Sequence, residues 1–331
     1  MKIEHIKYNS FFNTKSLKKI LYKPIKINYF STFIKNLNPN YVTGFCDGES
    51  CFSVYISSNA KLKVGYKFGL VFSIHLNKRD IELLKKIQFF FKSVGNIQIN
   101  ADDSISYVVT SIKDISNHII PHFEKYPLLT RKQADFELFK KVVILMNNKE
   151  HLTEEGLHKI LSIKASLNLG LPENLKVLYP EIIPVSKPQV KLPEIIDKNW
   201  LVGFVDAEGS FIVSIYKSKT KIGYAIKLAF CITQNNRDHL LISSLVKHLN
   251  CGRVSVNTRN SGVEYLVSGF NEINEIIIPL FKQYNLIGIK QRDFEDFCKI
   301  VLLMKNKQHL TAEGLSQVRK IHSVMNRRRD I

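Results

Sequence analysis

Alternating apolar and polar residues define four segments of the chain, two in each half. Over residues 51–57, Phe52, Val54 and Ile56 fall on one side of an extended chain, and polar or small residues fall on the other. The same alternation returns over residues 67–75, 210–216 and 225–233. Because side chains alternate across a strand, each segment is predicted to be a strand with one apolar face for helices to cover.

Each pair of strands follows a short apolar segment that has a small residue at every fourth position and ends in a carboxylate. The two segments are Val42-Thr43-Gly44-Phe45-Cys46-Asp47-Gly48-Glu49-Ser50 and Leu201-Val202-Gly203-Phe204-Val205-Asp206-Ala207-Glu208-Gly209. One helical turn separates Gly44 from Gly48, and the same spacing separates Gly203 from Ala207. Each predicted helix therefore has a face without large side chains, and two such faces allow helices to pack closely.

Close packing of these helices would place Glu49 beside Glu208. Two adjacent carboxylates repel each other unless a cation lies between them, and the C-terminal end of a helix also favours cations. Mg²⁺ prefers oxygen ligands, and one or two carboxylates are enough when phosphate and water supply the others. Asp47 and Asp206, two residues earlier, point away from the glutamates, so we expect them to make structural hydrogen bonds.

The second half of the chain repeats the first beyond these segments. A Lys-Gln-x-Asp-Phe-Glu run begins at Lys132 and again at Lys290, 158 residues later, while Glu49 and Glu208 are 159 residues apart. The run His-Leu-Thr-x-Glu-Gly-Leu is likewise present in both halves, at 151–157 and 309–315. A period this long indicates a duplicated domain with a pseudo-two-fold rather than a solenoid.

The pattern predicts the element order αββαββα in each half. After the first strand pair we expect a helix near 80–94, strands near 96–100 and 105–111, and two or three further helices, which is the composition of an α+β fold with antiparallel sheets. The predicted organisation is an N-terminal extension of unknown role over 1–39, a first domain over 40–170, a connector over 171–199 and a second domain over 200–331. Five prolines in the connector predict an extended segment without helix; they are Pro172, Pro180, Pro184, Pro188 and Pro193.

Composition narrows the class of partner. A formal net charge of +19 over 331 residues favours a polyanion. Five cysteines without a Cys-x-x-Cys pair argue against a disulfide framework or a zinc ribbon. No apolar run approaches the roughly 18 residues of a membrane span. The abundance of Lys, Ile, Asn, Phe and Tyr indicates an AT-rich genome, such as a mitochondrial one.

These features resemble the LAGLIDADG homing endonucleases, in the two-motif single-chain form found in fungal organellar introns, over roughly residues 40–325. The resemblance implies two sheets that form a saddle over the DNA major groove, with the motif helices packed at the domain interface. It also implies a mitochondrial, monomeric, site-specific endonuclease that depends on a divalent metal and cuts both strands of a long pseudo-palindromic DNA site, leaving short 3′ overhangs. Mg²⁺ is the expected cofactor, with Mn²⁺ or Ca²⁺ able to replace it in binding.

The resemblance also assigns roles to individual residues. The family binds its metals through the acidic residue of each motif, and a basic residue and a polar residue on the second strand complete each pocket. Gln234 occupies that strand position in the second half, whereas Leu76 does in the first. The predicted catalytic set is Glu49, Glu208, Lys132, Lys290 and Gln234, and the predicted metal set is Glu49, Glu208, Gly48 and Ala207.

The mixed faces of the strands are the predicted DNA-binding surface, since a two-stranded ribbon fits the major groove. The predicted DNA-binding residues are Cys51, Ser53, Tyr55, Ser57, Lys67, Ser73, His75, Ser210, Ile212, Ser214, Tyr216, Lys227 and Thr233. An uncovered sheet face is also common in proteins that bind no nucleic acid. Two alternatives stay open: a maturase that binds the RNA of its host intron, and a DNA-binding protein without catalysis.

Overall fold

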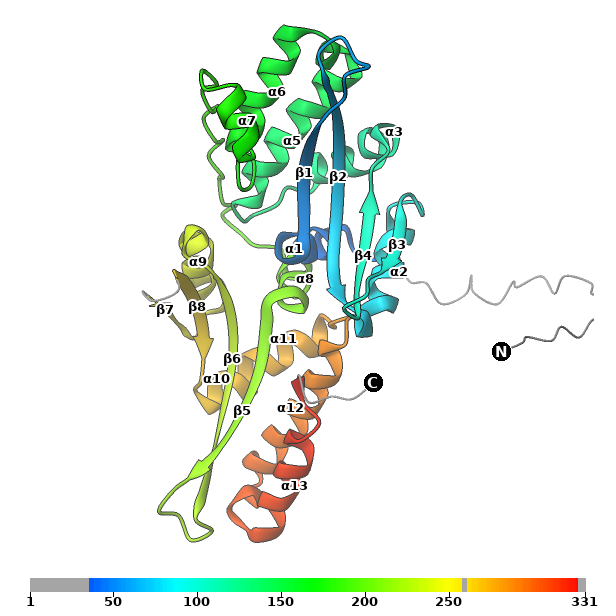
Figure 1. Ribbon diagram of the computed structural model, residues 1–331. Coiled ribbons are helices and arrows are strands. Elements are labelled where there is room, and N and C mark those ends of the chain that lie inside the picture. The colour runs from blue at the N-terminus through cyan, green and yellow to red at the C-terminus, as the bar shows by residue number, and fades with distance from the viewer. Residues whose placement is uncertain (1–35, 258–260, 327–331) are drawn as a thin grey trace, which may run out of the picture. The chain divides into compact units, whose positions relative to one another are not determined.

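The computed structural model describes residues 36–257 and 261–326, so most of the predicted extension over 1–39 lies outside the described residues. Two halves of the same architecture follow each other along the chain (Figure 1). The first half contains α1 (Pro39–Glu49), β1 (Ser50–Ser58), β2 (Tyr66–Asn77), α2 (Ile81–Phe90), β3 (Asn96–Ile99), β4 (Ser104–Val109), α3 (Ile112–Asp114), α4 (Ile120–Lys125), α5 (Lys132–Asn147) and α6 (Glu154–Ser166). The second contains α8 (Lys198–Glu208), β5 (Gly209–Lys217), β6 (Tyr224–Asn235), α9 (His239–Leu249), β7 (Arg253–Asn257), β8 (Gly262–Val267), α10 (Phe270–Glu272), α11 (Ile278–Gln283), α12 (Lys290–Lys305) and α13 (Ala312–His322).

Each half has one antiparallel sheet of four strands. The strand order is β1-β2-β4-β3 in the first sheet and β5-β6-β8-β7 in the second. The registers correspond, because Ser50 pairs with Ile74 in the first sheet and Gly209 pairs with Ile232 in the second. The predicted α+β fold, with two domains of αββαββα order, is confirmed.

The predicted alternation places one face of each sheet in the core. Phe52 of β1 is buried among the aromatic rings of Phe72, Phe123 and Phe136, with ring centroids 5.3 Å from Phe52 in each case. Phe211 takes the equivalent place in the second half, where its ring lies 5.2 Å from that of Phe294. The helices that follow the strands cover this face, with α5 packed against β1 and α12 against β5.

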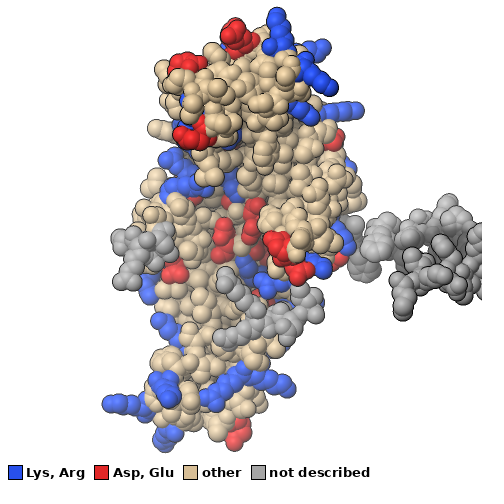
Figure 2. Space-filling view, in the orientation of Figure 1, with Lys and Arg blue, Asp and Glu red and all other residues tan. Residues whose placement is uncertain are grey.

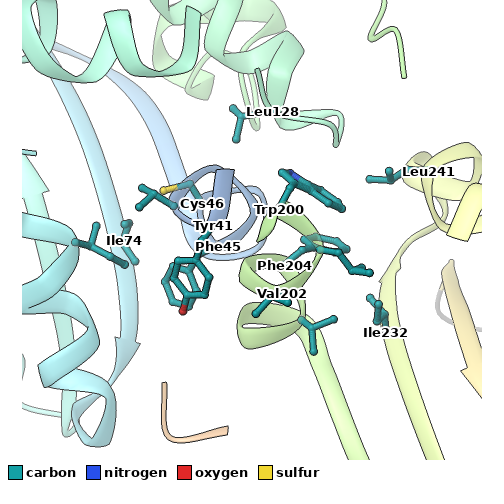
Figure 3. Packing of buried hydrophobic residues seen from close by; sticks show 14 of the residues in the cluster. Tyr41, Phe45, Cys46, Ile74, Leu128, Trp200, Val202, Phe204, Ile232 and Leu241 are labelled. Carbon is teal, nitrogen blue, oxygen red and sulfur yellow. The ribbon is translucent and has the colours of Figure 1, made fainter. Parts of the chain in front are cut away.

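The motif helices α1 and α8 pack directly against each other, as predicted. A Cβ atom on Gly44 would lie 1.9 Å from the carbonyl oxygen of Trp200, and one on Gly203 would lie 2.0 Å from the carbonyl oxygen of Tyr41. The two backbones are therefore in contact at these glycines. Figure 3 shows Tyr41 and Phe45 from α1 as one stacked pair of rings beside this contact, and Trp200 and Phe204 from α8 as another.

One prediction for the connector was wrong. Residues 173–178 form a helix, α7 (Glu173–Leu178), that begins directly after Pro172 and buries Leu175. Its six residues contain no proline, and a proline just before a helix fits there because its missing N–H would have no partner in the first turn. The described chain from 182 to 193 has no helix or strand, as the prolines predict.

Within the described residues, no helix is both long and apolar enough to span a membrane.

Candidate active site at the ends of the motif helices

Glu49 and Glu208 are the last residues of α1 and α8, and the helix packing brings them together as predicted. A Cβ atom on Gly48 would lie 2.3 Å from Cβ of Ala207 and 3.5 Å from Oε1 of Glu208. The carboxylate of Glu208 therefore lies against the end of the helix that carries Glu49. Figure 2 shows acidic side chains gathered in the middle of this view, with lysine and arginine side chains around them.

The surroundings disfavour negative charge on both glutamates. Burial and then the neighbouring Glu208 carboxylate raise the pKa of Glu49 to about 7, against the opposing effect of Lys132 and Lys290. Burial also raises the pKa of Glu208, while the same two lysines and Gln234 oppose that rise. A cation beside these carboxylates would remove the cost of holding them close together.

Lys132 and Lys290 join the glutamates, each from the first position of a helix in its own half. The Nζ atom of Lys132 donates hydrogen bonds of 2.9 Å to the carbonyl oxygens of Cys46 and Gly48. Lys290 does the same with Val205 at 2.9 Å and Ala207 at 3.0 Å. Each ammonium group thus bridges two carbonyls in the last turn of α1 or α8, and those of Cys46 and Val205 also accept the backbone N–H of Ser50 and Gly209. Burial lowers the pKa of each lysine.

Gln234 also reaches the site, and it makes the two halves different. Its Nε2 atom donates a 2.8 Å hydrogen bond to Oε1 of Glu208. The apolar side chain of Leu76 stands at the corresponding end of β2, where it lines a cavity beside Glu49. Glu208 therefore accepts a hydrogen bond from a side chain at this strand position. The side chain of Leu76 cannot donate one to Glu49.

A cavity of about 920 Å³ opens beside the two carboxylates and is lined by both halves. Glu49, Glu208 and Lys290 lie on its wall together with His75, Asp80 and His322. The cavity is large enough for a phosphate group and water next to the glutamates.

The donor set fits a hard divalent cation. Two carboxylates lie together, and the carbonyl oxygens of Gly48 and Ala207 each keep a second lone pair beside their lysine hydrogen bond. No group of three or more His, Cys, Asp or Glu side chains within residues 36–257 and 261–326 is placed to hold a metal. Mg²⁺ sites commonly have one or two protein carboxylates, with water and phosphate completing the coordination, and the glutamate pair matches that pattern.

Asp47 and Asp206 make the structural hydrogen bonds expected of them. Asp47 accepts from the backbone of Leu129 and Thr130 and from the indole of Trp200. Asp206 accepts from the backbone of Ile287 and Gly288 and from the hydroxyl of Tyr41. The sequence did not predict that each carboxylate would also bind an aromatic side chain of the opposite motif helix.

All thirteen predicted DNA-binding residues lie on the sheet faces that the helices leave uncovered, and each is at least partly exposed. The aromatic side chains Tyr55 and Tyr216 are 60% and 51% exposed. Ser106 of β4 was not predicted from the sequence; it pairs with His75, and its Oγ atom lies 2.8 Å from Nδ1 of that histidine. The alternation over 104–109 was the available signal, since it places Ser106 on the same face.

Two packed helices that end in glutamates, each helix joined to its own sheet, define a duplicated domain with one composite site. The family model of the LAGLIDADG endonucleases matches residues 42–143 and 201–301. The chain belongs to this family.

Similar proteins include intron-encoded proteins of fungi. "Probable intron-encoded endonuclease 3" of Neurospora crassa is 39% identical over 293 residues, which cover 87% of this chain and 55% of the relative. "Probable intron-encoded endonuclease 2" of the same organism is 40% identical, with coverage of 85% and 64%. The chain thus spans between half and two thirds of these relatives.

Solved structures match over nearly their whole length. I-SmaMI bound to cleaved DNA superimposes with a TM-score of 0.87 at 42% identity, covering 89% of this chain and 98% of that one. I-LtrWI bound to target DNA gives 0.86 at 45% identity, covering 88% and 100%. Another structure of I-SmaMI holds uncleaved DNA in the presence of calcium ions.

Proposed function

We propose that this protein is a site-specific homing endonuclease that cuts both strands of DNA with a divalent cation, Mg²⁺ by preference. The observation that supports this proposal is the pairing of Glu49 with Glu208 at the adjoining ends of α1 and α8, with a lysine from each half beside them. The solved relatives I-SmaMI and I-LtrWI are bound to DNA.

The glutamates, the lysines and Gln234 have different roles in the proposed reaction. Glu49, Glu208 and the carbonyl oxygens of Gly48 and Ala207 would hold the cation, which when bound activates water and stabilises charge on the phosphate and the leaving oxygen. Lys132 and Lys290 place positive charge next to the position of a scissile phosphate. Gln234 fixes the orientation of the Glu208 carboxylate through its hydrogen bond.

The exposed sheet faces supply the DNA contacts. Their residues differ between the halves, so the recognition site is long and only pseudo-palindromic, and a single chain contacts both half-sites. Lysines in the strand-connecting loops, such as Lys61 and Lys219, contact phosphates rather than bases. Binding weakens steeply with salt, because a net charge of +19 neutralises phosphates and releases their counterions.

Membership of this family also supports a proposal for where the enzyme acts and which DNA it cuts. The enzyme acts as a monomer in fungal mitochondria, where it cuts alleles that lack its intron and leaves short 3′ overhangs. Its folded units are the first domain over 40–170 and the second over 200–331, and the connector over 171–199 tethers them so that one chain does what a homodimer would otherwise do.

The first test is cleavage of a duplex that joins the two sequences flanking the intron, with Mg²⁺ and with EDTA. A single double-strand cut that EDTA abolishes is expected. Glu49→Gln and Glu208→Gln should each retain DNA binding and lose cutting, because the amide cannot supply the carboxylate charge. Cutting by either variant refutes the assigned metal site.

Two other outcomes would replace the proposal. Tight binding to the duplex without a cut in Mg²⁺ would identify a DNA-binding protein without catalysis. Absence of both binding and cutting, with affinity for the intron RNA, would identify a maturase.

A further inference from the structure

Asp80 and Asp238 occupy equivalent places in the two halves, 158 residues apart, at the end of a short 3₁₀ turn that follows β2 or β6. Each stands at the N-cap position of the next helix, α2 or α9, where an aspartate ordinarily accepts a hydrogen bond from its own helix. Neither aspartate does so. Each carboxylate binds the backbone of the other half instead.

The cross-half contacts form a matched pair. Oδ1 of Asp238 accepts a 2.6 Å hydrogen bond from the backbone N–H of Arg131, and Oδ1 of Asp80 accepts one of 2.9 Å from Ile289. Arg131 and Ile289 are the N-cap residues of α5 and α12, and neither side chain caps its helix. The carboxylate of one half therefore provides the acceptor at the start of a helix in the other, where the helix dipole favours negative charge.

The first residue of each of these helices is the active-site lysine. Lys132 follows Arg131 directly, and Lys290 follows Ile289. The backbone N–H that donates to the aspartate is thus one residue from the active-site lysine. The ammonium group of that lysine binds the carbonyl next to Glu49 or Glu208. A shift in the first turn of α5 or α12 would move that ammonium group relative to the carboxylates.

The two aspartates are held differently by their surroundings. Asp238 is 4% exposed, and the Nε atom of Arg237 lies 3.5 Å from its Oδ2 atom. Asp80 is partly exposed and lines the cavity beside Glu49, Glu208 and Lys290. Both nevertheless make the same hydrogen bond across the halves, which argues for a shared role.

We propose that Asp80 and Asp238 are positioning residues through which each half of the chain sets the active-site lysine of the other half. The inference rests on the proposed endonuclease function, because it concerns the cutting of each DNA strand. Asp238 positions Lys132, and Asp80 positions Lys290. Each lysine is then correctly placed only when both halves are docked, so the two cuts depend on one assembled site.

The test follows the two strands separately. The target duplex has a different fluorophore on each strand, and cutting is measured under single-turnover conditions. Lys132→Met and Lys290→Met first show which strand depends on which lysine. Asp238→Ala should then slow the Lys132-dependent strand by about tenfold relative to the other, and Asp80→Ala should slow the Lys290-dependent strand similarly, as expected for a misplaced catalytic group.

Conservative variants separate positioning from charge. Asp238→Asn and Asp80→Asn keep a side-chain oxygen that accepts the backbone hydrogen bond, so they should restore most of the lost rate. Thr153→Ala and Thr311→Ala are matched controls. Each removes a 3.0 Å hydrogen bond that caps the start of a different helix, α6 or α13. These controls should lower stability without favouring either strand.

The outcomes distinguish the two proposals. A wild-type protein that binds the duplex and cuts neither strand refutes the endonuclease function. A wild-type protein that cuts, combined with aspartate variants that slow both strands equally or slow the opposite strand, refutes the positioning role alone. Failure of the asparagine variants to restore the rate also refutes it.

Discussion

The indole Nε1 of Trp200 donates a 2.8 Å hydrogen bond to Oδ2 of Asp47, from one motif helix to the other. The hydroxyl of Tyr41 donates a 2.6 Å hydrogen bond to Asp206 in the opposite direction. Trp200 and Tyr41 are equivalent residues of the two halves, so each helix supplies both a donor and an acceptor. The glutamates at the helix ends are held by this reciprocal pair as well as by apolar packing.

Removing one donor should destabilise the interface measurably. Trp200→Phe leaves the buried Asp47 carboxylate without one of its partners, and we expect the free energy of unfolding to fall by about 1–3 kcal/mol. Urea denaturation followed by circular dichroism measures the change. Tyr216→Phe is the control, since that side chain is 51% exposed. Equal stability of the two variants would contradict a structural role for the Trp200–Asp47 bond.

The glycines at the helix contact should tolerate no side chain. Gly44→Ala places a methyl group 1.9 Å from a backbone oxygen, so the helices must separate, at a cost of about 3 kcal/mol or more. The melting temperature should drop strongly. Gly69→Ala tests the specificity of this effect, because its new Cβ atom would lie 3.8 Å from the nearest atom, Cβ of Tyr55. A Gly44→Ala protein as stable as Gly69→Ala would mean that the helices pack less closely than described.

The difference between Gln234 and Leu76 predicts unequal cutting of the two strands. Gln234 donates to Glu208, whereas the apolar Leu76 cannot do the same for Glu49. We expect the wild-type protein to nick one strand faster than the other, and Leu76→Gln to reduce the difference. Gln234→Leu should slow the cut that depends on Glu208, because it removes the side chain that donates to this carboxylate. Rates for the two labelled strands that are equal in all three proteins would exclude this explanation.

His122 predicts a loss of stability in mild acid. Burial against aromatic rings lowers its pKa to about 3, while histidine in an unfolded chain titrates near 6.5. Below that pH the unfolded state binds the proton and the folded state does not. Stability is therefore lost as the pH falls from about 6.5 to 3, with a slope of up to about 1.4 kcal/mol per pH unit from this group.

A variant isolates the contribution of this one histidine. His122→Phe keeps an aromatic ring in the same surroundings and removes the titration, so the pH dependence of its unfolding free energy should be flatter over that range. His118, four residues earlier and partly exposed, provides the control when changed to Gln. An unchanged slope in His122→Phe would rule out the assignment.

The sequence by itself determined the duplicated α+β fold, the two apolar sheet faces and the pairing of Glu49 with Glu208. These features depend on the local period of apolar and small residues, and repetition in both halves strengthened each of them. The departure of Leu76 from the Gln234 pattern was also visible in the sequence. The same local reasoning was wrong for α7, because proline density over the whole connector hid a proline-free stretch of six residues.

Only the tertiary structure decided how the two halves are joined. The bonds from Trp200 to Asp47, from Asp238 to Arg131 and from Asp80 to Ile289 connect positions at least 107 residues apart in the chain. No periodicity specifies such contacts, because a hydrogen bond requires its two atoms to be within about 3 Å with suitable angles, and that geometry exists only after the helices have packed. The sequence thus placed the chemical groups, and packing between the halves decided which of them meet.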